Sequence, residues 1–362
     1  MSAVAPDFAA ARCVRYRYRY SECRRCADAC PHEAIAANDE GITVDVVKCR
    51  NCALCTAACP TAALLPGNLP RVELLKRAIQ DKAFKFACAP SGLAADAIVP
   101  CLGALDAVML AYLGKRGVAV ELAGAAHCDR CEHGRSGALA LAARVKARDT
   151  LEESCAGETW GTLTVADDPT GIQADAFRPG RRGLFRRLIG RGVAEAEKAL
   201  QVPEELPVID KAIRSGPWHV PEMRELLQIV CRRSDGEPCR VPALPELAVA
   251  EMRLACGCTN CEACIRACPT GALRIRETES EWTLMFFADR CVGCGVCVEV
   301  CQPRVLGPAE ILDTTPGDAG IALNVLAKQR CSRCDRFFVS AKPQETCPVC
   351  RDDGAAFNRI FG

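Results

Sequence analysis

The chain has 362 residues, 28 of them cysteines, and its 46 Lys and Arg residues almost balance its 45 Asp and Glu residues. The length suggests two or three domains, and the balanced charge argues against a nucleic acid as the partner. Cysteines at this density in so long a chain favour metal binding over a disulfide framework. The sequence shows no apolar run long enough to span a bilayer and no secretory signal at its start. We therefore expect a cytoplasmic protein whose thiols stay reduced.

Residues 12–66 form the first cysteine-dense block, which holds two runs of cysteines. The second run is complete, with the spacing Cys49-x2-Cys52-x2-Cys55-x3-Cys59-Pro60. The first run has Cys23, Cys26 and Cys30 before Pro31, but Tyr20 stands where a leading cysteine is expected. Between the runs, Ile42, Val44 and Val46 alternate, which predicts a short strand.

Residues 80–150 change to an α/β rhythm. The pattern predicts strands at 84–88 and 118–122 and a helix at 105–113. The cysteines of this segment are Cys88, Cys101, Cys128 and Cys131. Cys88 and Cys128 follow predicted strands, where α/β sheets place their ligands, and His127 and His133 lie next to the Cys128–Cys131 pair.

Residues 151–249 are rich in Pro, Gly and charge, and we interpret them as a connector with a helix near 222–230. Segment 181–191 places five Arg beside apolar residues at helical spacing. We favour a solvated helix that packs its apolar side on this protein, with a docking helix for an acidic partner or an anionic membrane surface as the alternative. Cys155, Cys231, Cys239 and Cys256 fit no spacing pattern and are interpreted as spare thiols.

Residues 250–308 repeat the plan of the first block. The two runs are Cys258-x2-Cys261-x2-Cys264-x3-Cys268-Pro269 and Cys291-x2-Cys294-x2-Cys297-x3-Cys301, with an extended stretch at 283–287 between them. In the last run Gln302 precedes Pro303, so proline falls one place late. Two copies so far apart indicate duplication or fusion. Residues 325–362 hold two further pairs, Cys331-x2-Cys334 and Cys347-x2-Cys350.

The complete runs resemble those of bacterial two-cluster ferredoxins, in which three cysteines of one loop and a fourth from the other run hold each 4Fe-4S cluster. The resemblance covers residues 12–66 and 250–308. It implies one cluster on Cys258, Cys261, Cys264 and Cys301, and a second on Cys291, Cys294, Cys297 and Cys268. It also implies a third cluster on Cys49, Cys52, Cys55 and Cys30. The alternative is four structural zinc sites, which rarely take three thiolates from one loop.

Cys13 is the candidate for the fourth ligand of the remaining cluster, which has only Cys23, Cys26 and Cys59. Residues 14–20 alternate like a strand, and at about 3.3 Å per residue an extended strand would carry Cys13 more than about 20 Å from position 20. A hairpin or loop would bring it back. We expect Cys13 to be a ligand, with a labile or three-iron cluster as the alternative.

The other two cysteine groups have their own resemblances. The middle segment is loosely similar to the small iron-sulfur subunit of methanogen-type hydrogenases and to thioredoxin-like 2Fe-2S proteins, which implies a 2Fe-2S cluster on Cys88, Cys101, Cys128 and Cys131. A zinc or dithiol site and unligated thiols remain the alternatives. The C-terminal pairs resemble a zinc ribbon, which implies one zinc on Cys331, Cys334, Cys347 and Cys350. Iron of the rubredoxin kind is the alternative there.

The sequence thus predicts a modular α+β fold. Its parts are a dicluster ferredoxin module at 12–66, a small α/β domain at 80–150, a connector at 151–249, a second module at 250–308 and a zinc-ribbon-like segment at 325–362. We expect an iron-sulfur electron carrier with about four 4Fe-4S clusters that serves donor and acceptor oxidoreductases. The alternative is a redox enzyme subunit with a catalytic dithiol or 2Fe-2S centre in the middle domain. No nucleotide-binding or hydrolase motif is present.

Overall fold

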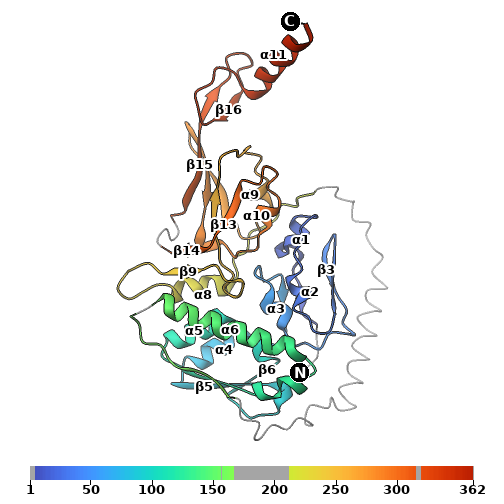
Figure 1. The fold of residues 1–362 in the computed structure, drawn as a ribbon, viewed down its shortest axis with the longest axis vertical. Coiled ribbons are helices and arrows are strands. Elements are labelled where there is room, and N and C mark those ends of the chain that lie inside the picture. The colour runs from blue at the N-terminus through green and yellow to red at the C-terminus, as the bar shows by residue number, and fades with distance from the viewer. Residues whose placement is uncertain (1–4, 156, 167–211, 315–318, 362) are drawn as a thin grey trace.

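The computed structural model describes residues 5–155, 157–166, 212–314 and 319–361, and the fold is α+β (Figure 1). The predicted helix at 181–191 lies outside the described residues. Several small sheets, with short helices between them, replace one continuous sheet. None of the helices in the described part of the chain is long and apolar enough to cross a membrane.

The N-terminal module is built from two antiparallel strand pairs and three short helices. Strand β1 (Asp7–Phe8) pairs with β4 (Leu64–Leu65), and β2 (Ile35–Asn38) pairs with β3 (Gly41–Val44). The helices are α1 (Val14–Arg17), α2 (Arg25–Asp28) and α3 (Leu54–Ala58). The strand indicated by the alternation at 14–20 is therefore wrong, because its first half is the helix α1.

The middle segment is a parallel sheet of order β6-β5-β7-β8 with helices beside it. The strands are β5 (Ala83–Cys88), β6 (Ala97–Val99), β7 (Ala119–Ala123) and β8 (Leu163–Ala166). Helices α4 (Arg71–Ala78), α5 (Ala107–Lys115) and α6 (Gly134–Ser154) lie together beside it (Figure 1). The side chain of Asp106 caps α5 by accepting a hydrogen bond from the Val108 N–H at 2.9 Å.

This sheet extends beyond the boundary expected at residue 150, because β8 pairs in parallel with β7. Part of the expected connector is therefore an edge strand of the sheet. A second part is helix α8 (Glu222–Val230), which begins and ends where the sequence predicts.

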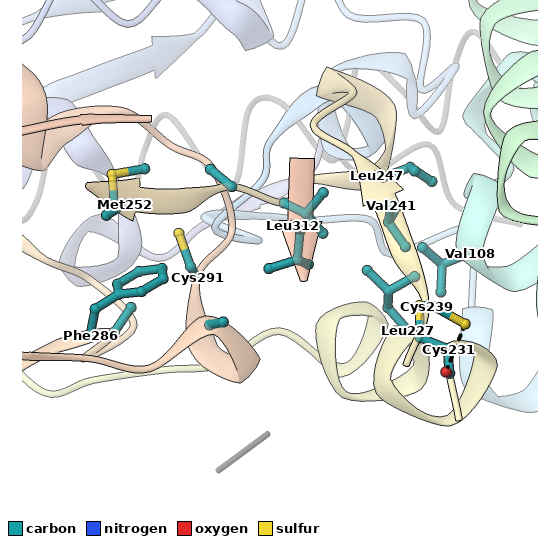
Figure 2. Packing of buried hydrophobic residues seen from close by; sticks show 14 of the residues in the cluster. Val108, Leu227, Cys231, Cys239, Val241, Leu247, Met252, Phe286, Cys291 and Leu312 are labelled. Atoms are coloured by element: carbon teal, nitrogen blue, oxygen red, sulfur yellow. Dashed lines mark hydrogen bonds between the residues drawn. The ribbon is translucent and has the colours of Figure 1, made fainter. Parts of the chain in front are cut away.

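The second module repeats the strand pairs of the first around helices α9 (Ala263–Ala267) and α10 (Val296–Glu299). Strand β10 (Glu251–Leu254) pairs with β13 (Leu306–Ala309), and β11 (Leu273–Glu277) pairs with β12 (Glu281–Phe286). Strand β9 (Arg240–Pro242), from the expected connector, pairs with β14 (Ile311–Asp313). Figure 2 shows the core that these strands share with α8.

The C-terminal part forms an arm that projects from the body (Figure 1). It consists of β15 (Ile321–Arg330), β16 (Phe337–Ser340) and α11 (Pro348–Phe361). The first part of β15 pairs with β12 of the second module, and its last four residues pair with β16. One long strand thus joins the arm to the module.

Candidate functional site

The complete cysteine runs share one backbone conformation. The residues on either side of the second cysteine have positive φ: Asn51 (+55°) and Ala53 (+61°), Asn260 (+56°) and Glu262 (+61°), and Gly293 (+57°) and Gly295 (+85°). Two left-handed residues around one cysteine curl the loop, so that its three thiols face a common point. The incomplete run with Cys23 and Cys26, which the structure describes throughout, lacks this pair.

Each expected set of four cysteines is close together. We call Cys13, Cys23, Cys26 and Cys59 site 1; Cys30, Cys49, Cys52 and Cys55 site 2; Cys268, Cys291, Cys294 and Cys297 site 3; and Cys258, Cys261, Cys264 and Cys301 site 4. The four cysteines of site 2, of site 3 and of site 4 each line one small cavity. In every cavity one cysteine comes from the other run, as crossed ligation requires.

Site 1 gathers around Cys13, which is buried and immediately precedes helix α1. Its thiol interacts electrostatically with those of Cys23 and Cys59, and Cys26 interacts with all three. Cys13 lies between a 3₁₀ helix and α1. Because residues 14–17 are helical and not extended, Cys13 stays close to the other cysteines of site 1.

The electrostatics of these sites fit a bound iron-sulfur cluster. Burial raises the pKa of Cys52 and of Cys291 to about 11 and that of Cys26 and of Cys264 to about 12, and neighbouring thiolates add to the effect. Such thiols stay protonated at neutral pH unless a cation compensates their charge. Iron bound by these cysteines would supply that charge, and the ligands would then be thiolates. Backbone N–H groups also point at sulfur, as from Ala34 to Cys30 (3.4 Å) and from Ala63 to Cys59 (3.3 Å).

A fifth set, which we call the middle site, comprises Cys88, Cys101, Cys128 and Cys131. All four line one cavity at the ends of parallel strands β5, β6 and β7. Two glycines keep that cavity open. A Cβ on Gly124 would lie 3.0 Å from the Cys88 sulfur, and one on Gly137 would lie 3.1 Å from the Cys101 sulfur.

The middle site adjoins site 2. Cys101 interacts electrostatically with Cys52 of site 2. His32 Nε2 and His133 Nδ1 are 3.1 Å apart, and both rings lie close to the Cys52 sulfur. The sequence singled out His133 only as a neighbour of the Cys128–Cys131 pair and missed His32, because nothing in the spacing brings positions 32 and 133 together.

Site 1 adjoins site 3 across the contact between the two modules. Val14 packs with Ala267, Val296 and Val300 in one small core, which Cys23 and Cys294 flank. The Arg25 guanidinium donates a hydrogen bond to Gly293 O at 2.9 Å and interacts with Cys294.

The remaining expected set, the C-terminal quartet, is Cys331, Cys334, Cys347 and Cys350. All four sulfurs lie within 4.8 Å of one another. The backbone N–H of Cys347 points at the Cys331 sulfur at 3.2 Å, and this hydrogen bond lowers the pKa of Cys331 to about 6. Four converging thiols with a stabilised thiolate form a donor set that suits one tetrahedral metal ion.

Three of the cysteines interpreted as spare thiols are also brought together. Cys155, Cys231 and Cys239 are buried at one place in the core shared by α6, α8 and β9. Cys256 is exposed and lies outside all of these sets.

The comparisons with known proteins agree with the dicluster geometry. A family described as the 4Fe-4S dicluster domain matches residues 21–63 and 257–305, which include every member of sites 1 to 4 except Cys13. The polyferredoxin protein MvhB of Methanothermobacter marburgensis is 43% identical over 49 residues, 12% of each chain. An ion-translocating oxidoreductase complex of Methanosarcina acetivorans contains a protein that is 30% identical over 83 residues, 23% of this chain and 26% of that protein.

The chain thus spans only a small part of the length of these relatives, and no solved structure matches it. The matches nevertheless fall on the two modules whose loops carry the cysteine sets. Residues 21–63 and 257–305 are therefore two 4Fe-4S dicluster domains of the ferredoxin type, and in these domains the chain is similar to polyferredoxins.

Proposed function

We propose that the protein holds one 4Fe-4S cluster in each of sites 1 to 4 and relays single electrons between redox proteins. A bound cluster would accept or release one electron at a potential set by its charge, the hydrogen bonds to its sulfurs and its exposure. The residues of the chain hold the clusters, exclude water from them and set their spacing. The partners are a donor and an acceptor oxidoreductase.

The contact between site 1 and site 3 is the observation that carries this proposal. Cys23 of site 1 and Cys294 of site 3 flank the same small core, as does Cys264 of site 4. Arg25 singles out sites 1 and 3, because it interacts with both Cys23 and Cys294. Within each module the two sites are also adjacent, since Cys55 interacts with Cys26 and Cys297 interacts with Cys264. The sites therefore form one series in the order 2, 1, 3, 4, and a relay needs such a continuous order.

The two ends of the series differ in exposure. At one end, Cys261 of site 4 is exposed, so a partner could approach this cluster closely. The loop beside it is fixed to the arm, because Asn324 of β15 donates a hydrogen bond to the Asn260 side chain at 3.0 Å. At the other end, site 2 is next to the middle site. We infer that electrons enter or leave at site 4 and that the middle site is the opposite terminus.

Flash photolysis tests the relay. A small photoreductant would reduce the exposed site 4 first, and electron arrival would be followed at site 1. The three-iron cluster expected in the Cys13→Ser variant would serve as a spectroscopic marker there. A relay gives a first-order arrival whose rate does not change when the protein is diluted. A rate proportional to protein concentration would mean transfer between molecules and would overturn the proposal.

We further propose a 2Fe-2S cluster in the middle site, supported by the four cysteines around one cavity and by its place next to site 2. The double variant Cys128→Ser, Cys131→Ser should lose about two iron atoms per chain while sites 1 to 4 keep theirs. If the variant lost catalytic turnover at the middle site while electrons still reached site 2, the protein would be a redox enzyme subunit and not a carrier. Unchanged iron content would refute the cluster.

For the C-terminal quartet we propose one zinc ion, which would fold an arm that is too small for a core of its own. The Cys334→Ser variant should lose zinc and leave the iron content unchanged. Its matched control is Cys256→Ser, which removes an exposed cysteine outside every set. Iron in place of zinc in the wild-type arm would contradict the assignment.

A further inference from the structure

Cys155, Cys231 and Cys239 converge from three separate segments. Cys155 follows the last residue of α6, Cys231 follows the last residue of α8, and Cys239 immediately precedes β9. Cys155 and Cys239 are 0% exposed and Cys231 is 6% exposed. None of them belongs to a cluster site or to the C-terminal quartet, so the proposed relay leaves them without a role.

Two of the three sulfurs are in contact. The Sγ atoms of Cys155 and Cys239 are 2.9 Å apart. The Cys239 thiol also donates a hydrogen bond to Cys231 O at 3.0 Å, which Figure 2 shows, and the Cys155 thiol points at Val230 O at 3.8 Å. The Cys231 thiol interacts electrostatically with both. The arrangement is thus a close pair with a third thiol beside it.

A disulfide explains this arrangement better than a metal ion. Metal ligands must surround a common centre, and among the described residues the groups whose ligand atoms converge in that way do not include these three cysteines. A disulfide needs only two sulfurs, and the pair is already in contact. A third thiol next to a disulfide can exchange with it.

The pair lies where parts of the molecule meet. Helix α6 lies beside the parallel sheet of the middle segment, whereas β9 pairs with β14 next to the second module. Helix α8 lies between them, and its Arg224 donates a hydrogen bond to Cys291 O of site 3 at 2.8 Å. A bond from Cys155 to Cys239 would therefore fasten the middle segment to the second module.

We propose that Cys155 and Cys239 form a reversible disulfide, with Cys231 as the thiol that exchanges with it, and that the oxidant is a low-molecular-weight disulfide of the glutathione type. The Cys239 thiolate attacks one sulfur of the oxidant, releases one small thiolate and leaves a mixed disulfide. The Cys155 sulfur then attacks Cys239 and releases the second small thiolate. Two cysteine sulfurs are oxidised, two oxidant sulfurs are reduced, and the two cysteine protons pass to the released thiolates.

An exposed turn gives the oxidant its route. Residues 234–238, which directly precede Cys239, are all exposed, and Gly236 within them has a φ of +78°. Movement of this turn would uncover Cys239 and would break the hydrogen bond that the Ser234 N–H donates to the Glu158 carboxylate at 2.9 Å. Lys115 holds the neighbouring end of α8 in place through hydrogen bonds to Val230 O (2.8 Å) and Arg232 O (2.6 Å).

The test uses the full-length, iron-loaded protein under anaerobic conditions. It is equilibrated with glutathione buffers of increasing disulfide fraction, quenched in acid, alkylated in denaturant, digested and analysed by mass spectrometry. The peptide that links Cys155 to Cys239 should increase with the disulfide fraction and disappear with dithiothreitol. The proposal would be overturned if both cysteines were alkylated in every buffer. It would also be overturned if the Cys155→Ser variant contained less metal than the wild type, because the three cysteines would then be metal ligands.

Variants separate the pair from the third thiol. Cys155→Ser and Cys239→Ser should abolish the linked peptide, whereas the control Cys256→Ser should leave it unchanged. Cys231→Ser should keep the peptide but slow its formation and its reduction several-fold. Iron content and the visible spectrum show whether each variant still folds. Hydrogen exchange gives a second readout, because the disulfide should increase protection of β9 in the wild type and not in Cys155→Ser.

Discussion

Cys13 takes the fourth ligand position of site 1, for which the ferredoxin spacing provides no cysteine. The run that should begin at position 20 has Tyr20 there, and the tyrosine is exposed. Cys13 approaches the same set from the other side, between a 3₁₀ helix and α1, and is buried beside Cys23 and Cys59. A thiol that lies earlier in the chain can thus complete site 1 without the usual loop.

We predict that Cys13→Ser converts site 1 to a three-iron cluster, because one iron loses its only protein ligand. Iron should fall by about one atom per chain, and an oxidised three-iron signal should appear in the EPR spectrum. Cys256→Ser is the control and should change neither. Unaltered iron content with no new signal would show that Cys13 is not a ligand.

Arg25 is a charged contact between the two modules. Its guanidinium reaches Gly293 O and interacts with Cys294, while its neighbour Arg24 pairs with Asp28 on the surface. A cation close to a cluster stabilises the reduced form, which carries one more negative charge.

Arg25→Gln should therefore lower the reduction potential of site 3, by about 40 mV if the lost interaction is about 1 kcal/mol. The matched control is Arg24→Gln, which removes the same charge one residue away and should change the potential much less. Redox titration followed by EPR measures both. Equal shifts in the two variants would mean that net charge, and not the contact with Cys294, sets the potential.

The sequence predicts long helices and strands better than it predicts short ones. Strand β5 and helix α8 were predictable, since apolar periodicity and local propensity agree there. Helix α1 was not, because four residues carry too little periodic signal and contacts with distant segments fix their conformation, such as the Arg17 hydrogen bond to Gly216 O at 3.0 Å. Strand β8 was missed because its pairing with β7 is non-local.

The curled loops give a prediction about glycine. Gly295 has a φ of +85° and open space beside it, so Gly295→Ala adds only backbone strain, about 1 kcal/mol. Gly293→Ala places a Cβ 2.8 Å from Val249 O and should destabilise more. The rate at which guanidinium bleaches the cluster absorbance, measured anaerobically, should rise from wild type to Gly295→Ala to Gly293→Ala. Equal rates for the two variants would show that the Val249 contact does not matter.

At the scale of the whole molecule, contacts between modules decide the order of the sites. The resemblance to two-cluster ferredoxins implied the membership of sites 2, 3 and 4, and the structure brings the cysteines of each set together. Which sites are neighbours depends on long-range packing, such as Val14 against Val296 and His32 against His133. The meeting of Cys155 with Cys239 depends on it too. No local pattern encodes these contacts, so the sequence alone could not reveal them.

The most direct test of the cluster assignment is the content of iron, acid-labile sulfide and zinc per chain in anaerobically prepared protein, with EPR of the dithionite-reduced sample. Four 4Fe-4S clusters predict about sixteen iron atoms, and a 2Fe-2S cluster in the middle site raises this to about eighteen. One zinc ion and magnetically coupled signals from neighbouring reduced clusters should accompany them. Eight or fewer iron atoms, or little iron with several zinc ions, would contradict the account.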